Sequence, residues 1–76
     1  MTIAQLIAIG HTRAQALVAE KVLQGKPNAV IADELSISYV TVKSHLTDIY
    51  RKFDVGSRAQ YIIKMHNTDL STLLNS

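Results

Sequence analysis

The amino-acid sequence predicts an all-α fold, because four segments carry apolar residues at helical spacing and each follows a residue that can cap a helix. No segment alternates apolar and polar residues with a period of two, and no Asn-Gly or Asp-Gly pair indicates a hairpin. The 76 residues are enough for one domain and too few for a second independent core. We therefore expect one small bundle of helices.

The first of these helices is predicted over residues 13–24. Thr12 and Gln15 have the spacing of a capping box, in which each side chain hydrogen-bonds the backbone amide of the other residue. Gly25 is expected to end the helix, because glycine readily takes the conformation that follows a last turn, and Pro27 follows shortly after it.

A short second helix comes next, which Asn28 can cap and which Ser36 and Ile37 interrupt. Ser38 caps a third helix over about residues 39–53. Its apolar stripe consists of Val42, Leu46, Ile49 and Phe53. Because a turn of about three residues joins the second and third helices, the pair is predicted to form a helix-turn-helix.

A fourth helix is predicted over residues 58–66, with Ser57 as its cap. Both ends of the chain are apolar, so residues 3–9 are expected to form a short helix and Asp69 to cap a final turn. The predicted fold is thus a four-helix bundle with a central helix-turn-helix and a short extra helix at each end.

The composition excludes several classes of protein. The chain has no cysteine, so it holds no disulfide, iron–sulfur cluster or zinc–thiolate site. Its longest apolar run has four residues, far fewer than the roughly 20 of a membrane-spanning helix. Since the N-terminus lacks the features of a signal peptide, we expect a cytoplasmic protein that contacts no membrane.

Neither catalysis nor metal binding is expected. A chain of this size rarely encloses a substrate pocket. The histidines His11, His45 and His66 lie on three different elements, and no carboxylate is spaced to complete a metal site with them. We therefore predict no catalytic residue, no bound metal and no cofactor.

Positive charge is concentrated in one part of the sequence. Residues 1–42 hold three Lys or Arg against three Asp or Glu, whereas residues 43–64 hold five against two, a net charge of +3. The predicted third helix has an exposed side with almost no acidic residue. A fold that gathers these cations on one face has a basic patch of the kind that binds nucleic acid.

Beyond these patterns, the sequence resembles the LuxR/FixJ-type DNA-binding domain, whose stand-alone members are the GerE-like regulators. The resemblance covers about residues 11–66, and its most specific part is a Thr-Val-Lys-x-His segment with Ile-Ala ten residues earlier. The matching residues are Gly25 to Asn28, Ile31 and Ala32, Leu35 to Ser38, Thr41 to His45, Ile49 to Phe53, Val55, and Arg58 to Gln60.

The resemblance implies a bacterial regulator that activates or represses transcription at two-fold-related sites in double-stranded DNA. It implies a recognition helix, residues 39–53, in the major groove and a homodimer formed through the fourth helix. On this basis the chain divides into an apolar segment 1–10, the DNA-binding domain 11–66 and an apolar tail 67–76. Another regulator or RNA polymerase is a further partner to consider.

By position, the resemblance assigns Lys43, Ser44 and Thr47 to base edges, although for Ser44 and Thr47 a plain exposed role is nearly as well supported. It assigns six residues to phosphates or to orienting the helix: Asn28, Ser38, Val40, Thr41, His45 and Lys52. Arg51 is added to this set, since a phosphate contact and a favourable charge near the helix C-terminus explain it equally well.

Other residues have structural explanations. The side chain of Asn28 cannot easily cap a helix and bind phosphate at once, and Arg58 is expected to pair with Asp54 and fix the turn. The tyrosines are expected to serve packing: Tyr39, Tyr50 and Tyr61.

Four positions depart from the family pattern. They are His11 in place of Leu, Ala14 in place of Arg, Gln15 in place of Glu, and Lys21 in place of an apolar residue. These changes are expected to weaken the first helix and to leave the DNA face intact. Because the base-facing set holds one cation, Lys43, we expect modest discrimination between bases.

The apolar residues of the fourth helix and the tail have two explanations. They cover the core of one chain or they form a symmetric dimer interface, and we favour the dimer. The residues assigned to this interface are Ala59, Ile62, Ile63, Met65 and Leu70. Residues 1–10 are a second candidate interface.

The sequence is therefore compatible with two functions. The favoured one is sequence-specific binding of double-stranded DNA by a dimeric transcription regulator. The alternative is a protein-interaction module that keeps this fold, pairs with another regulator and binds DNA weakly or not at all. Lys43 and the clustered cations favour the first, and the apolar ends favour the second.

Overall fold

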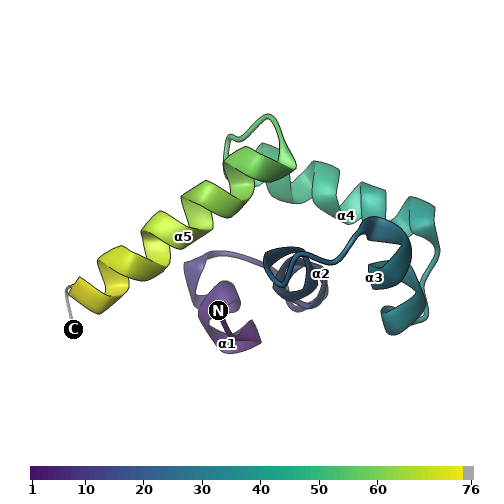
Figure 1. Ribbon diagram of the computed structural model, residues 1–76, viewed down its shortest axis with the longest axis horizontal. Coiled ribbons are helices and arrows are strands. Elements are labelled where there is room, and N and C mark those ends of the chain that lie inside the picture. The colour runs from purple at the N-terminus through teal and green to yellow at the C-terminus, as the bar shows by residue number, and fades with distance from the viewer. Residues whose placement is uncertain (75–76) are drawn as a thin grey trace.

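The computed structural model describes residues 1–74, and the side-chain surroundings of residues 1–68. Every regular element in this range is a helix, in the order α1 (Ile3–Ile9), α2 (Arg13–Leu23), α3 (Asn28–Leu35), α4 (Tyr39–Lys52) and α5 (Arg58–Leu74). The predicted fold class is confirmed. Figure 1 shows α4 and α5 meeting at an angle, with α1, α2 and α3 lying below them in this view.

Short polar side chains set the starts of the helices. Thr12 Oγ1 accepts from the Gln15 amide, and Gln15 Oε1 accepts from the Thr12 amide, both at 3.1 Å, which confirms the predicted capping box at α2. Ser38 Oγ accepts from the Thr41 amide at 3.0 Å and so caps α4, as predicted. These bonds satisfy amides that have no partner inside the helix.

Left-handed residues set the ends of the helices. Gly25 has a φ of +83° after α2, and Ser36 and Asp54 have φ values of 56° and 55° after α3 and α4. Beyond Ser36, the amide of Ile37 donates to the carbonyl of Ala32 at 3.0 Å. This bond closes the tight turn between α3 and α4 and thereby forms the helix-turn-helix.

The core forms around α2, which packs against α1, α3 and α4. Large side chains from all five helices are fully buried there, and burial of each such side chain stabilises the fold by about 1.5–3 kcal/mol. The largest of them are Leu6, Val18, Val22, Ile31, Val42, Ile49, Tyr61 and Met65. The core therefore fixes which side of α4 remains outside.

The two ends of the chain behave differently from each other. Residues 3–9 form the predicted short helix, and Leu6 buries its side chain completely. At the other end, α5 does not stop near residue 66 but runs to Leu74, so Asp69 lies inside a helix and does not cap a new one. Polar residues inside a helix cost less than about 1 kcal/mol each, which is too little to end α5 there.

Candidate nucleic-acid interface

The open side of α4 carries Lys43, Ser44 and Thr47, the residues predicted to face base edges. All three side chains are exposed. At about 100° per residue, they fall within an arc of about 100° around the helix. The buried residues of α4 lie on the other side of the helix: Val42, Leu46 and Ile49. The structure thus brings the predicted base-facing set together on one surface.

Two contacts order this surface. Lys43 Nζ lies 5.9 Å from the centre of the Tyr39 ring, within the range of a cation–π contact. Thr47 Oγ1 donates to the carbonyl oxygen of Lys43 at 3.0 Å. Because this bond uses the hydroxyl proton of Thr47, the oxygen presents lone pairs outward as an acceptor. The surface therefore offers a cation beside an acceptor.

The start of α4 is held by its own cap. Ser38 Oγ, which accepts from the Thr41 amide, also lies 2.8 Å from Thr41 Oγ1. Val40 is 73% exposed, the most exposed of the large apolar side chains that the structure describes. Ser38 and Thr41 thus fix the entry to the helix, and Val40 extends the open side toward its N-terminal end.

Arg51 continues the open side toward the C-terminal end of α4. Its side chain is 78% exposed, and Asp48 approaches it only to 3.9 Å. An exposed ion pair of this length contributes little to stability, so the contact with Asp48 does not fix the position of the Arg51 guanidinium group.

Two of the predicted phosphate contacts are turned toward the protein. Lys52 Nζ donates to the carbonyl of Gly10 and to Gln15 Oε1, both at 2.9 Å, and so joins the end of α4 to the start of α2. His45 is half-buried and lines a cavity of about 120 Å³ whose other walls are apolar. These two residues therefore hold α4 against the bundle.

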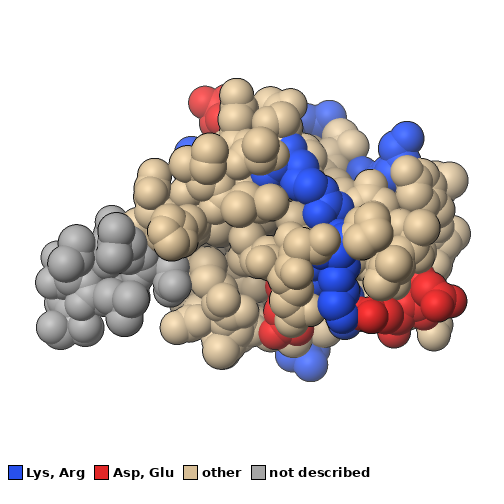
Figure 2. Space-filling model, viewed as in Figure 1, with Lys and Arg blue, Asp and Glu red and all other residues tan. Residues whose placement is uncertain are grey.

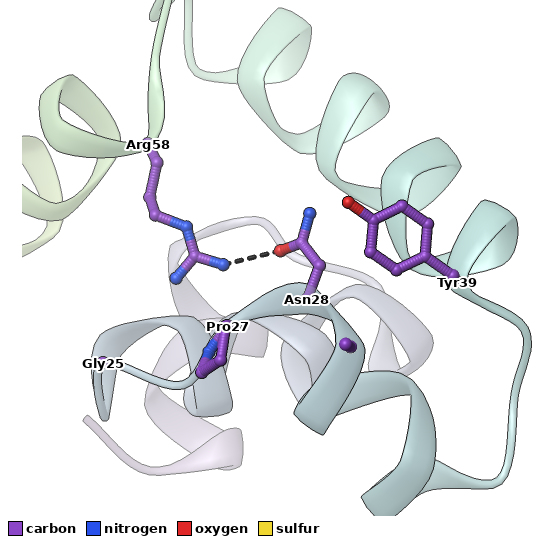
Figure 3. Close-up of a pocket in the computed structure, with 6 residues that line it drawn as sticks. Gly25, Pro27, Asn28, Tyr39 and Arg58 are labelled. Atoms are coloured by element: carbon purple, nitrogen blue, oxygen red, sulfur yellow. Dashed lines mark hydrogen bonds between the residues drawn. The ribbon is translucent and has the colours of Figure 1, made fainter.

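Asn28 and Arg58 form a bridge that the sequence did not reveal. Asn28 does not cap α3, since the N-cap is Pro27 and no described side chain caps this helix. Instead Asn28 Oδ1 accepts from Arg58 Nη2 at 2.6 Å (Figure 3), while Arg58 Nη1 donates to the carbonyl of Lys26 at 2.9 Å. The predicted Asn28 cap and the predicted Arg58–Asp54 pair are therefore wrong, because the turn before α5 directs Arg58 across to α3.

This bridge borders two clefts. One, of about 490 Å³, is lined by the turn between α2 and α3, by Tyr39 and by the bridge itself (Figure 3). The other, of about 230 Å³, is lined by Asn28 and Arg58 together with Lys43 and Thr47. The start of α3 is thus continuous with the open side of α4.

Charge is unevenly neutralised over the molecule. Figure 2 shows Lys and Arg side chains in a line across one face, ending beside acidic side chains. Lys21 and Lys26 both place Nζ 2.8 Å from Glu34 Oε1, and these hydrogen bonds hold the pKa of the Glu34 carboxyl below its usual value. Lys43, by contrast, makes no ion pair within the described part of the chain. The open side of α4 therefore carries a lysine whose charge no described carboxylate neutralises.

The predicted dimer interface is only partly on the outside. Ile63 is 61% exposed, and Ala59 is exposed one turn earlier in α5. Ile62 is half-buried against the core. Met65 is 1% exposed, so its assignment to an interface is wrong, because it fills the chain's own core. Leu70 lies outside the residues whose side chains the structure describes.

His11 is a second residue whose role the sequence did not reveal. It is 3% exposed, and its Nδ1 lies 2.8 Å from the carbonyl oxygen of Leu6, to which it must donate. Nε2 therefore accepts from the hydroxyl of Tyr61 at 2.6 Å. Burial lowers the pKa of His11, the bond to Leu6 opposes this, and the charge of Lys52 adds to the lowering.

The short α3, the tight turn and the exposed α4 define a helix-turn-helix domain, the class that binds DNA to regulate transcription. The family model for bacterial regulatory proteins of the luxR family, GerE, matches residues 10–65. The chain therefore belongs to the LuxR family of bacterial regulatory proteins.

Two curated relatives support this membership. The glycerol metabolism activator of Pseudomonas putida is 40% identical over 63 residues, which are 83% of this chain and 28% of that protein. The transcriptional regulatory protein LiaR of Bacillus subtilis (strain 168) is 41% identical over 49 residues, 64% of this chain and 23% of that protein. The similarity thus spans about a quarter of each relative's length.

No solved structure matches the chain. Within the described residues, none of the helices has the length and apolar character needed to cross a membrane.

Proposed function

We propose that the chain binds double-stranded DNA as a homodimer in the cytoplasm, with α4 in the major groove. Lys43, Ser44 and Thr47 contact base edges. Asn28, at the start of α3, and Arg51, at the end of α4, contact phosphates. Val40 lies on the open side of α4 near the DNA backbone. The remaining members of the predicted set orient α4: Ser38, Thr41, His45 and Lys52.

The observation that carries this proposal is the open side of α4. It holds a lysine that makes no ion pair with a described residue, two hydroxyl side chains and an exposed arginine. Lysine can donate to guanine, the Ser44 hydroxyl can donate or accept at a base edge, and the Thr47 oxygen can accept. A helix of 14 residues is about 21 Å long and fits along a major groove about 12 Å wide.

The proposed dimer uses α5. Exposed Ile63 and Ala59 lie one turn apart on this helix and so form a small apolar surface that a second copy of α5 could cover. A two-fold contact here would carry two copies of α4 to successive turns of the duplex, about 34 Å apart. This spacing predicts an inverted-repeat binding site.

The proposal is tested by fluorescence anisotropy of a labelled mixed-sequence duplex, titrated with the protein at several salt concentrations. We expect binding at about 50 mM salt, with a log K that falls linearly with log salt by about 0.9 for each phosphate contact. Selection of binding sites from a random library then gives the recognised sequence. A folded protein that does not bind at this salt concentration contradicts the proposal and favours the protein-interaction module.

A further inference from the structure

We infer that Arg58 is a positioning residue for DNA binding, which turns the side-chain amide of Asn28 so that its NH2 group donates to a DNA phosphate. This inference rests on the proposed function. Arg58 is the first residue of α5 and Asn28 the first residue of α3, so the bridge joins two helix starts that are 30 residues apart in the chain.

The orientation of the amide follows from the chemistry of its partner. A guanidinium group has five donors and no acceptor, so the atom of Asn28 that faces Arg58 must be the carbonyl oxygen. The contact of 2.6 Å is short, as expected for a hydrogen bond from a charged donor. The NH2 group of Asn28 must then point away from Arg58, and Figure 3 shows it directed into the open space between Arg58 and Tyr39.

The place to which this NH2 group points suits an anion. Asn28 and Arg58 line one cleft together with Lys43 and Thr47 of the open side of α4. Among the described residues no side chain caps the first turn of α3, and the positive end of its helix dipole lies at Asn28, which lines this cleft. A phosphate of DNA lying along α4 would therefore meet an aligned donor at Asn28.

Arg58 itself is engaged by the protein. Both terminal nitrogens donate inward, one to the carbonyl of Lys26 at 2.9 Å and the other to Asn28, and the residue is only half-exposed. Its effect on DNA is thus expected to pass through Asn28. A double-mutant cycle separates this indirect effect from a direct contact.

The test measures duplex affinity for the wild type, Arg58→Met, Asn28→Ala and the double variant, with urea unfolding to identify the fraction folded. Methionine keeps an unbranched side chain but cannot donate. We expect each single variant to lose roughly tenfold in affinity, as for a lost hydrogen bond to a charged group. The double variant should lose no more than either single variant.

Asn28→Asp is the matched variant that keeps the bridge. Its carboxylate still accepts from Arg58, so the free energy of unfolding should stay equal or rise, but the phosphate now meets a negative oxygen instead of a donor. We expect at least a tenfold loss of affinity in this stable variant. An affinity of Asn28→Asp equal to that of the wild type would overturn the inference.

The outcomes distinguish a failure of this inference from a failure of the proposed function. If the wild type binds the duplex and Arg58→Met has the same effect with and without Asn28, Arg58 acts on DNA independently and only this inference fails. If the wild type does not bind the duplex at all, the proposed function fails and the inference fails with it.

Discussion

The hydroxyl of Tyr61 donates to Nε2 of His11 at 2.6 Å in the interior of the protein. His11 precedes α2 and Tyr61 lies in α5, so this bond ties the long C-terminal helix to the other end of the chain. The ring of Phe53 packs 4.5 Å from the imidazole ring. A histidine in a position where the family pattern has leucine is thus accommodated by a complete set of partners.

Tyr61→Phe is expected to destabilise the fold. The substitution leaves Nε2 of His11 buried without a donor, which costs about 1–3 kcal/mol in the free energy of unfolding. Urea unfolding followed by circular dichroism measures this cost. Tyr39→Phe is the control, since the Tyr39 side chain is half-exposed and its hydroxyl makes no hydrogen bond within the described residues. Equal effects of the two substitutions would contradict the importance of the buried bond.

Acidification is expected to lower stability through His11. Because the folded-state pKa of His11 lies below the value near 6.5 of an unfolded chain, the unfolded chain takes up a proton that the folded chain does not. Above pH 6.5, His11 therefore does not make the free energy of unfolding depend on pH. As the pH decreases from 6.5 toward the folded-state pKa, the free energy of unfolding falls.

The measurement is urea unfolding at several pH values between about 7.5 and 5, above the range in which exposed carboxyl groups titrate. His11→Leu is the control and should remove the part of the slope that belongs to His11. A slope that is unchanged in His11→Leu would assign the pH dependence to other groups.

Most of the fold could be predicted from the sequence, because its signals are local. Thr12 and Ser38 predict the starts of α2 and α4 from residues no more than three positions away, and Gly25 predicts the end of α2. The length of α5 could not be predicted in this way, since the low helix propensity of a residue such as Asp69 is too weak a signal to locate a helix end.

The candidate site was predictable to the extent that it lies on one helix. The exposure of Lys43 and Thr47 follows from the position of the buried stripe of α4. Arg58 lies 30 residues from its partner Asn28, and Tyr61 lies 50 residues from its partner His11. A periodic sequence pattern does not predict contacts over such separations. The assignment of Met65 to an interface failed for a related reason, because apolar spacing alone does not distinguish a core from a second chain.

Lys43→Ala is expected to weaken binding to a selected site by roughly tenfold, since a side chain at a base edge contributes about 1–3 kcal/mol. It should also relax the preference for one base pair. Anisotropy on the selected site and on single-base variants measures both effects. Arg13→Ala removes one charge from the exposed start of α2 and should change affinity little. An equally small loss of affinity in both variants would show that Lys43 does not contact the DNA.

Ile63→Glu is expected to convert the dimer to a monomer, because it places a charge in the proposed contact between two α5 helices. Sedimentation velocity measures the change. The matched control is Ile7→Glu, at a residue of α1 that is 41% exposed, and it should leave the dimer intact. A dimer that survives Ile63→Glu but not Ile7→Glu would move the interface to residues 1–10.

The central claim, that the open side of α4 faces DNA, is tested most directly by amide NMR spectra of the ¹⁵N-labelled protein with and without the selected duplex. The proposed function predicts the largest shifts along α4 around Lys43, Ser44 and Thr47, together with Asn28 at the start of α3. The shifts of amides on the exposed side of α1, which is not part of the proposed interface, are predicted to be smaller than these. Shifts confined to α1 or α5, or the absence of shifts from a folded protein at low salt, would contradict the claim.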